Sequence, residues 1–528
     1  MLTKQNAHGA RTLGRAVRER YAGGQTDYSM EPVLLADHDG QPLGRIRPGD
    51  AVVFCCRRGE REIQLTEAFT DPDFSRFPRP SLGDLQFSIL TLYHEKFKHL
   101  PVAFAPVRLA DTLAATVSRA GLRQRHIAES EKFAHVTFFF NGGRNGPFEG
   151  EADECIPSPK GVPFDQVPQL SLAEVAARVI EGMREETDLI VTNFANGDVI
   201  GHTASREAKL KCASIVDRHL GHVVEEALAR DYVVFITADH GNLEVMMHPD
   251  GTAHVSHTTN PVEFLIVDPR SGPVKTLPGG RLADVAPTIL NVFGLKPPAA
   301  MTGTDLVPGH DWDGKRRLLL IILDGWGIGR PDESNPIFLS RTPVWDRLVC
   351  KYPHTALRAA GEDVGLQPDK AGNSEAGHLN LGAGRVVLQD DARLDLAMQD
   401  GSFESNEVFL RLMEHVKQNG TDLHLIGLLT AKSSHGSIEY PLALLRMAKK
   451  QGLQNAFLHV IFDGRSTQPG SAPALLEELE TQLQIIGLGQ VVTGMGRGLA
   501  LDRDGNYDRT RRAYEALVTG AGEKFICD

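Results

Sequence analysis

The sequence has few of the features that mark secreted, membrane or zinc-finger proteins. Its 528 residues include six cysteines, and none is spaced as the CxxC pairs of a zinc site. So few thiols fit a reducing compartment, and the first residues show no apolar core of a secretory signal. The longest strongly apolar run, residues 318–323, is too short to span a bilayer. We therefore expect a soluble cytoplasmic protein with no membrane partner.

Positive charge and aromatic residues are also scarce. The formal net charge of -12 argues against general binding to nucleic acid, although a local cluster of arginines can still bind an anionic small molecule. An aromatic content of 6%, together with 52 glycines, is typical of an α/β enzyme with many turns. The length of the chain predicts two or more domains, each large enough to bury a core.

Three short apolar runs each end near a carboxylate, at Asp198, Asp239 and Asp324. Continuous apolar runs indicate strands that are buried on both faces of a parallel sheet. Helical patterns over 171–186 and 206–230 lie between them, and this alternation predicts a doubly wound α/β sheet. Ligands of such sheets bind beyond the carboxyl ends of the strands. The three acids are therefore expected to form one site.

Histidines accompany these acids in patterns that suit a divalent metal. Asp198 and His202 are four residues apart, so one helical turn would place both on the same face. Asp239 and His240 are adjacent and would point in different directions if the strand persists, so that each could serve a different metal. His257 lies in the segment HVSHTTN. Surface pairs and strand-end caps are the alternative, and these residues alone leave both interpretations open.

A serine among glycines is the candidate nucleophile. Ser374 lies in AGNSEAGHLNLGAGR, just before a predicted helix, where the helix N-terminus favours anions. A bound metal could turn its hydroxyl into a nucleophile. The alternative is that Ser374 is simply the N-cap of that helix.

Several longer segments resemble one enzyme family. LLIILDGWGIG, YPHTALRAAGEDVGLQPDKAGNSEAGHLNLGAGR, ITADHGN and HTTNP are similar to the phosphatase-domain motifs of cofactor-independent phosphoglycerate mutases, in the alkaline phosphatase superfamily. The resemblance implies an alkaline-phosphatase-like doubly wound sheet domain plus a second α/β transferase domain. It also implies a glycolytic isomerase that interconverts 3-phosphoglycerate and 2-phosphoglycerate through a phosphoserine. The enzyme would need two divalent metal ions, expected to be Mn²⁺, and no bisphosphoglycerate. We expect a monomer with no nucleic-acid partner.

The order of these segments differs from that of the family. The LDGWG segment opens the family's chains, but here it begins near residue 318, after segments that normally come last. The sequence therefore resembles a circular permutant in which residues 305–317 link the family's original ends. The implied phosphatase-like domain is continuous, over 108–388. The implied transferase domain is split into 1–107 and 389–528.

The resemblance also implies roles for individual residues. One metal set would be Asp324, Ser374, Asp239 and His240, and the other would be Asp198, His202 and His257. The implied catalytic residues are Ser374 as nucleophile, Lys132 at the transferring phosphate, and His435. The implied substrate-binding residues are Arg58, Arg61, Arg465, Ser466, Arg497 and Arg503.

One position departs from the family in a way that bears on function. Ser466 stands where the family has an aspartate that moves protons on and off the glycerate hydroxyls. The departure leaves open a metal-dependent phosphatase, or a phosphomutase of another substrate in the same superfamily. A non-catalytic phosphometabolite sensor is a third alternative, and the complete metal set argues against it.

Overall fold

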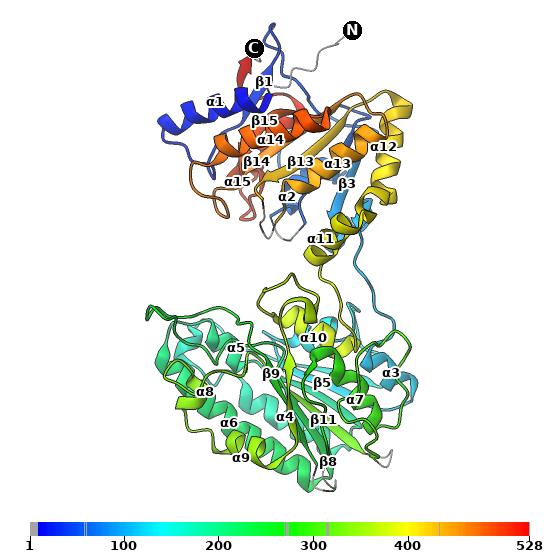
Figure 1. The fold of residues 1–528 in the computed structure, drawn as a ribbon, viewed down its shortest axis with the longest axis vertical. Helices are drawn as coiled ribbons and strands as arrows, with labels where there is room; N and C mark the ends of the chain where they lie inside the picture. The colour runs from blue at the N-terminus through cyan, green and yellow to red at the C-terminus, as the bar shows by residue number, and fades with distance from the viewer. Residues whose placement is uncertain are drawn as a thin grey trace. The chain divides into compact units, whose positions relative to one another are not determined.

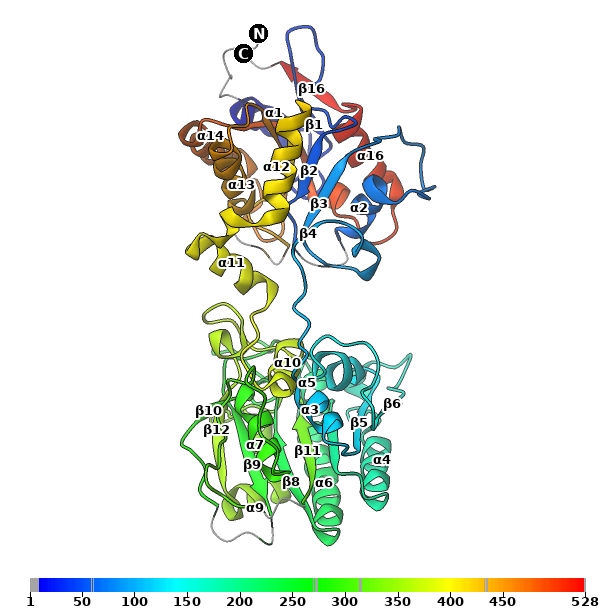
Figure 2. The same cartoon turned by 90° about the vertical axis from the view of Figure 1, so that its right-hand side faces the viewer.

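The computed structural model describes residues 9–57, 59, 61–268, 270, 274–312, 316–431, 433 and 435–526. The chain divides into two compact units (Figures 1 and 2). Unit 1 combines residues 1–106 with 393–528, and unit 2 comprises residues 107–392. These boundaries lie next to those that the family resemblance implies. None of the described helices is long and apolar enough to cross a lipid bilayer.

Unit 2 is built on an eight-stranded sheet with the order β10-β12-β9-β8-β11-β7-β5-β6. The three predicted apolar runs form its centre as β8 (Tyr232–Thr237), β11 (Arg317–Leu323) and β7 (Leu189–Phe194), which are parallel neighbours. They are almost completely buried, which explains why their sequences are apolar without alternation. The other strands are β5 (Gln124–Glu129), β6 (Glu151–Ile156), β9 (Val262–Val267), β10 (Gly280–Arg281) and β12 (His354–Arg358).

Helices cover both faces of this sheet, so the predicted doubly wound α/β fold is confirmed (Figure 2). The helical patterns over 171–186 and 206–230 form α4 (Leu172–Arg184) and α6 (Arg206–Ala229), which pack against each other. A single apolar cluster runs through the unit. The other α-helices that lie wholly in this unit are α3 (Leu113–Arg119), α5 (Asn196–Gly201), α7 (Val285–Val292), α8 (Pro336–Leu339), α9 (Pro343–Lys351) and α10 (Ser374–Ala383), and η2 (His135–Phe139) is a π-helical turn.

Part of the predicted linker, 305–317, is buried in unit 2. Its residues 305–312 form no helix or strand, and residues 313–315 lie outside the described residues. Leu306, Val307 and Trp312 are buried in the core of the unit. The Leu306 amide also donates to Thr288 Oγ1 at 2.9 Å. The segment is therefore part of the fold of unit 2.

Unit 1 has its own eight-stranded sheet, with the order β16-β1-β15-β14-β13-β2-β3-β4. All neighbouring strands are parallel except β1 and β15, which are antiparallel. The sheet therefore joins strands from both ends of the chain. The strands are β1 (Val33–Ala36), β2 (Ala51–Phe54), β3 (Gln86–Thr91), β4 (Val102–Phe104), β13 (Leu423–Leu429), β14 (Ala456–Phe462), β15 (Gln490–Gly496) and β16 (Glu523–Ile526).

Two separate apolar clusters cover the two faces of this second sheet. One contains residues of α1 (Gly9–Ala22), α12 (Glu407–Asn419), α13 (Glu439–Lys450) and α14 (Ala472–Ile486). The other contains residues of α2 (Ile63–Thr70) and α16 (Tyr507–Val518). The remaining α-helices are α11 (Asp390–Asp400) and α15 (Arg497–Ala500). Unit 1 is thus a second α/β layer structure, as predicted.

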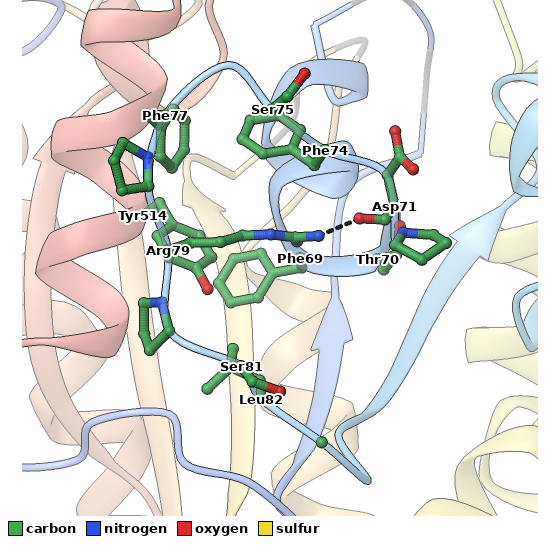
Figure 3. A pocket seen from close by; sticks show the side chains of 14 residues that line it. Phe69, Thr70, Asp71, Phe74, Ser75, Phe77, Arg79, Ser81, Leu82 and Tyr514 are labelled. Atoms are coloured by element: carbon green, nitrogen blue, oxygen red, sulfur yellow. Dashed lines mark hydrogen bonds between the residues drawn. The ribbon is translucent and has the colours of Figure 1, made fainter.

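A pocket of about 670 Å³ lies at the C-terminal end of α2 (Figure 3). Arg79 crosses it, donates hydrogen bonds to the backbone oxygens of Ala68 and Asp71, and lies 5.1 Å from the centre of the Phe74 ring. Arg79 is therefore part of the lining of this pocket. Its lining shares no residue with the predicted substrate-binding set, and its aromatic side chains are Phe69, Phe74, Phe77 and Tyr514.

A buried ion pair ties two strands of unit 2 together. Arg316, just before β11, donates two parallel hydrogen bonds to Asp268, just after β9, at 2.8 and 3.0 Å. Both residues are buried. The next residue, Arg317, pairs instead with the largely exposed Glu186.

We predict that Arg316→Leu destabilises unit 2 by about 3–5 kcal/mol, because the buried Asp268 carboxylate loses the guanidinium charge and its two hydrogen bonds. Arg317→Leu is the matched control, and its exposed pair contributes at most about 1 kcal/mol. Urea unfolding followed by tryptophan fluorescence measures both changes, since Trp312, Trp326 and Trp345 all lie in unit 2. Equal effects of the two substitutions would contradict the prediction.

Candidate active site

Charged side chains follow four adjacent parallel strands of unit 2. Asp239 follows β8, Asp324 follows β11, Asp198 follows β7, and Lys132 follows β5. Because parallel strands end at the same edge of a sheet, these residues come together there. All four are buried. The three acids therefore lie together at the carboxyl ends of the strands, as the sequence predicted.

One group of possible metal ligands consists of Asp239, His240 and Asp324, whose donor atoms lie within 4.8 Å of one another. His240 Nε2 is 3.3 Å from Asp239 Oδ2 and 3.6 Å from Asp324 Oδ1. The Ser374 hydroxyl is 2.9 Å from His240 Nε2 and donates to Asp324 Oδ1 at 3.3 Å. The structure thus brings together the four residues of one predicted metal set.

A second group consists of Asp198, His240 and His257. His257 Nε2 is 3.1 Å from Asp198 Oδ1, and His202 Nε2 is 3.2 Å from the same oxygen. Asp198 lies in α5 and His202 directly follows that helix, so the four-residue spacing does place both side chains on one face. The second predicted metal set is therefore also gathered in space, with His202 partly exposed at its rim.

His240 lies in both groups, which differs from one expectation. Adjacent Asp239 and His240 were expected to point in different directions if the strand persisted. The strand β8 instead ends at Thr237, so strand alternation does not apply to the two residues. Both side chains reach the same cluster, and His240 Nε2 is also 3.9 Å from Asp198 Oδ1.

A single buried lysine faces these three carboxylates. Lys132 Nζ donates to Asp198 Oδ2 at 2.7 Å, Asp324 Oδ1 at 2.8 Å and Ser374 Oγ at 2.6 Å. Burial would lower the pKa of Lys132, but the carboxylates, Asp324 foremost, raise it above its usual value. One cation against three buried carboxylates leaves an excess of negative charge, which is costly in a protein interior.

The surroundings shift the pKa values of the acids in different directions. Burial and then the neighbouring Asp239 raise the pKa of Asp324. Burial would also raise the pKa of Asp198, yet Lys132 and the two histidines beside it hold that pKa well below its ordinary value. Asp239 Oδ2 is buried and accepts no well-aligned hydrogen bond, although His240 Nε2 lies 3.3 Å and His378 Nδ1 3.4 Å from it. Clustered carboxylate and imidazole donors with excess negative charge fit divalent metal ions.

Ser374 is free of the capping role that was its alternative. It is the first residue of α10, and the N-cap is Asn373, whose Oδ1 accepts from the Ala376 amide at 2.9 Å. The interpretation of Ser374 as N-cap is therefore wrong. The helix approaches β8 closely, because a Cβ at Gly377 would lie 2.6 Å from the Asp239 carbonyl oxygen. The serine hydroxyl is left to face Lys132 at the helix N-terminus.

Three polar residues that the sequence analysis did not single out support the cluster. Asn193 Nδ2 donates to Asp324 Oδ2 at 2.6 Å and to His378 Nε2 at 3.0 Å. Asn242 Nδ2 donates to Asp198 Oδ1 at 2.8 Å. Partners of this kind orient the ligands that a metal contacts. His378 and Asn242 lie inside the motifs NSEAGHLN and TADHGN, so the sequence could have indicated that they belong to the site.

In unit 1, the predicted substrate-binding residues follow adjacent parallel strands in the same manner. Arg61 follows β2, Arg465 and Ser466 follow β14, and Arg497 follows β15. Arg503 lies a few residues beyond α15, and His435 follows β13. The prediction for Arg58 lies outside the described residues. The described members thus belong to one edge of the sheet of unit 1.

These residues differ in exposure. Arg497 is buried and paired with Asp463. Arg61 is buried and donates to the Leu501 carbonyl oxygen at 3.1 Å. The exposed members are Arg465, Ser466 and Arg503.

His435 has a partner that the sequence analysis missed. Its Nδ1 lies 3.1 Å from Glu62 Oε1, on a residue that is completely buried. The two residues are far apart in the sequence, so no local motif joins them.

The chain matches two protein-family descriptions. Residues 45–297 match the Metalloenzyme superfamily, and residues 394–527 match the N-terminus of BPG-independent PGAM (iPGM_N). The segment that is N-terminal in that family thus lies in the last third of this chain.

Similar curated proteins carry one name. The 2,3-bisphosphoglycerate-independent phosphoglycerate mutase of Moorella thermoacetica is 44% identical over 307 residues, which is 58% of this chain and 59% of the relative. The protein of that name from Salinibacter ruber is 44% identical over 301 residues, 56% and 57% of the two chains. The matched region thus spans less than two thirds of these relatives. A crystal structure of Leishmania mexicana phosphoglycerate mutase aligns with a TM-score of 0.38 and 27% identity, over 51% of this chain and 53% of that chain.

The two family descriptions and the curated relatives agree with one another, and the donor cluster of unit 2 agrees with a metalloenzyme. The chain is similar to the metalloenzyme superfamily over residues 45–297, and over residues 394–527 to the N-terminus of cofactor-independent phosphoglycerate mutases, the name that its curated relatives carry.

Proposed function

We propose that this protein interconverts 3-phosphoglycerate and 2-phosphoglycerate, without bisphosphoglycerate, through a phosphoserine at Ser374. The names of the relatives support this reaction. The observation that carries it is the position of Ser374 Oγ, 2.6 Å from Lys132 Nζ and 2.9 Å from His240 Nε2. A hydroxyl among cationic and metal-ligating groups suits attack on a phosphate.

Two divalent metal ions are part of this proposal, with manganese as the expected metal. Asp324, Ser374, Asp239 and His240 would hold one ion, and Asp198, His202 and His257 would hold the other. Bound there, metals neutralise charge on phosphoryl oxygens and favour the ionised serine.

The roles of the remaining residues follow from the chemistry of transfer. Ser374 Oγ forms a bond to phosphorus as the bond from phosphorus to the glycerate oxygen breaks. Lys132 binds the transferring phosphoryl group. His435 gives a proton to the departing glycerate oxygen and later takes one from the other hydroxyl, which accepts the phosphoryl group back, so no net proton is consumed.

Arginines would hold the substrate carboxylate through paired, charge-assisted hydrogen bonds. The residues proposed for substrate binding are Arg58, Arg61, Arg465, Ser466, Arg497 and Arg503. We assign the phosphatase-like role to unit 2 and the transferase role to unit 1.

We also infer that the segment order is circularly permuted. The match to the family's N-terminus lies at 394–527, whereas the metalloenzyme match lies earlier, at 45–297. A local alignment to an unpermuted relative would then cover only part of each chain, as it does here. A cytoplasmic monomer is the state that we propose.

Removal of divalent metal is expected to abolish turnover, because the donor cluster carries excess negative charge. We predict two ions per chain in the parent protein and fewer in Asp239→Asn and Asp198→Asn, as counted by elemental analysis. Glu207→Gln, an exposed change in α6, is the control and should keep both ions. Full activity after exhaustive chelation, with metal absent by elemental analysis, would remove the two-metal proposal.

Ser374→Ala is expected to abolish phosphoglycerate conversion while leaving the fold intact, since the attacking oxygen is lost. Incubation of the parent protein with phosphate-labelled substrate should mark Ser374, as mass spectrometry of its peptides would show. Ser402→Ala, at an exposed position in unit 1, is expected to retain activity. Substantial turnover by folded Ser374→Ala would refute the nucleophile.

Ser466 tests the choice between a mutase and the alternative phosphatase or phosphomutase. Serine cannot carry protons as an aspartate can, and general acid–base help is worth roughly 10²–10⁴-fold. We expect a slow mutase with some phosphate release. Ser466→Asp should raise phosphoglycerate turnover and lower phosphate release, measured side by side. If neither protein converts phosphoglycerate, the enzyme acts on another substrate.

A further inference from the structure

A carboxylate is buried in unit 1 where no helix cap or surface role accounts for it. Glu62 is 0% exposed and directly precedes α2, but its side chain makes no capping hydrogen bond to that helix. Its Oε1 lies 3.1 Å from His435 Nδ1. Its Oε2 is buried and has no hydrogen-bond partner.

Burial of a carboxylate with an unpartnered oxygen costs folding free energy. The presence of Glu62 at this position therefore suggests a functional role. Burial raises the pKa of Glu62, and the hydrogen bond from His435 opposes that rise. Among the described residues, the charged and titratable groups that interact with it include His435, Arg497, Cys56 and Tyr93. Arg497 is itself paired with Asp463. The direct contact of Glu62 is therefore with His435.

The backbone around His435 is held firmly. Its amide donates to Ser433 Oγ at 3.1 Å, and its carbonyl oxygen accepts from the Arg57 amide at 3.0 Å. The Arg57 guanidinium also donates to the Ser433 carbonyl oxygen at 2.8 Å. The His435 side chain is 16% exposed, whereas that of Glu62 is fully enclosed. The imidazole is thus fixed at its inner nitrogen and reaches the surface elsewhere.

We propose that Glu62 is the positioning residue of His435. Its carboxylate accepts the Nδ1 proton, which sets the tautomer in which Nε2 exchanges protons with the substrate, and it stabilises the imidazolium that forms. This inference rests on the proposed function and adds a residue to it. Glu62 would thus supply a carboxylate beside His435 in a chain that lacks the family's aspartate at position 466.

A purely structural role makes a different prediction. A carboxylate at the start of α2 can stabilise that helix through its dipole. Loss of that effect would lower stability and leave both the turnover number and its pH dependence unchanged. Kinetic and spectroscopic measurements therefore separate the two roles.

The kinetic test compares Glu62→Gln with Glu67→Gln in the full chain. Glu67 is a matched control, because it lies in α2, the helix that Glu62 precedes, but binds Lys96 and Tyr507. Carboxylates that orient a histidine are worth roughly 10–100-fold in activity, so we expect a loss of that size in kcat for Glu62→Gln, with little change in KM. The acidic limb of its pH–rate profile should also move, and Glu62→Asp should recover part of the loss. A folded Glu62→Gln with the kcat and pH profile of Glu67→Gln would overturn the proposal.

Nuclear magnetic resonance of the full chain with ¹⁵N-labelled histidine gives a readout that does not need turnover. The parent should show a low-field proton on Nδ1 of His435, assigned by its absence in His435→Asn. It should be lost in Glu62→Gln and kept in Glu67→Gln. A proton on Nε2 alone in the parent, or a signal unchanged by Glu62→Gln, would overturn the inference. If the parent fails to convert phosphoglycerate, the proposed function fails, while the resonance still decides whether Glu62 holds His435.

Discussion

The parallel alignment of β8, β11, β7 and β5 is the constraint on which the site of unit 2 depends. Parallel strands end at one edge, so residues that directly follow them are forced together whatever their charge. Here that geometry collects three carboxylates, which repel one another in a buried setting. Lys132 offsets part of that repulsion, and divalent ions suit the remainder.

In unit 1, the corresponding edge of the sheet carries mainly positively charged side chains. Arginines and a histidine follow β2, β13, β14 and β15, and each buried member has a partner. Asp463 pairs with Arg497, and Glu62 pairs with His435. The acidic edge of unit 2 suits divalent metals, and the basic edge of unit 1 suits anionic ligands.

Sequence patterns predicted the regular parts of this structure better than its side-chain contacts. The central strands were predictable because burial on both faces requires uninterrupted apolar runs, and Asp198 and His202 because their spacing matches a helical turn. The contact of Glu62 with His435 was not predictable, since it joins loops from opposite ends of the chain. The capping role of Asn373 and the packing of Trp312 also depend on tertiary neighbours that no local pattern reveals.

The split of unit 1 between the two ends of the chain bears on how the protein is made. Strand β2 pairs on one side with β3, which follows it closely, but on the other with β13, at residues 423–429. During synthesis, the open edge of β2 stays unpaired until all of unit 2, which ends at residue 392, and then β13 have left the ribosome. Exposed strand edges favour aggregation, and pairings between distant segments form slowly. Unit 2 is continuous in the sequence and can fold first, whereas β2 keeps one unpaired edge until β13 is made.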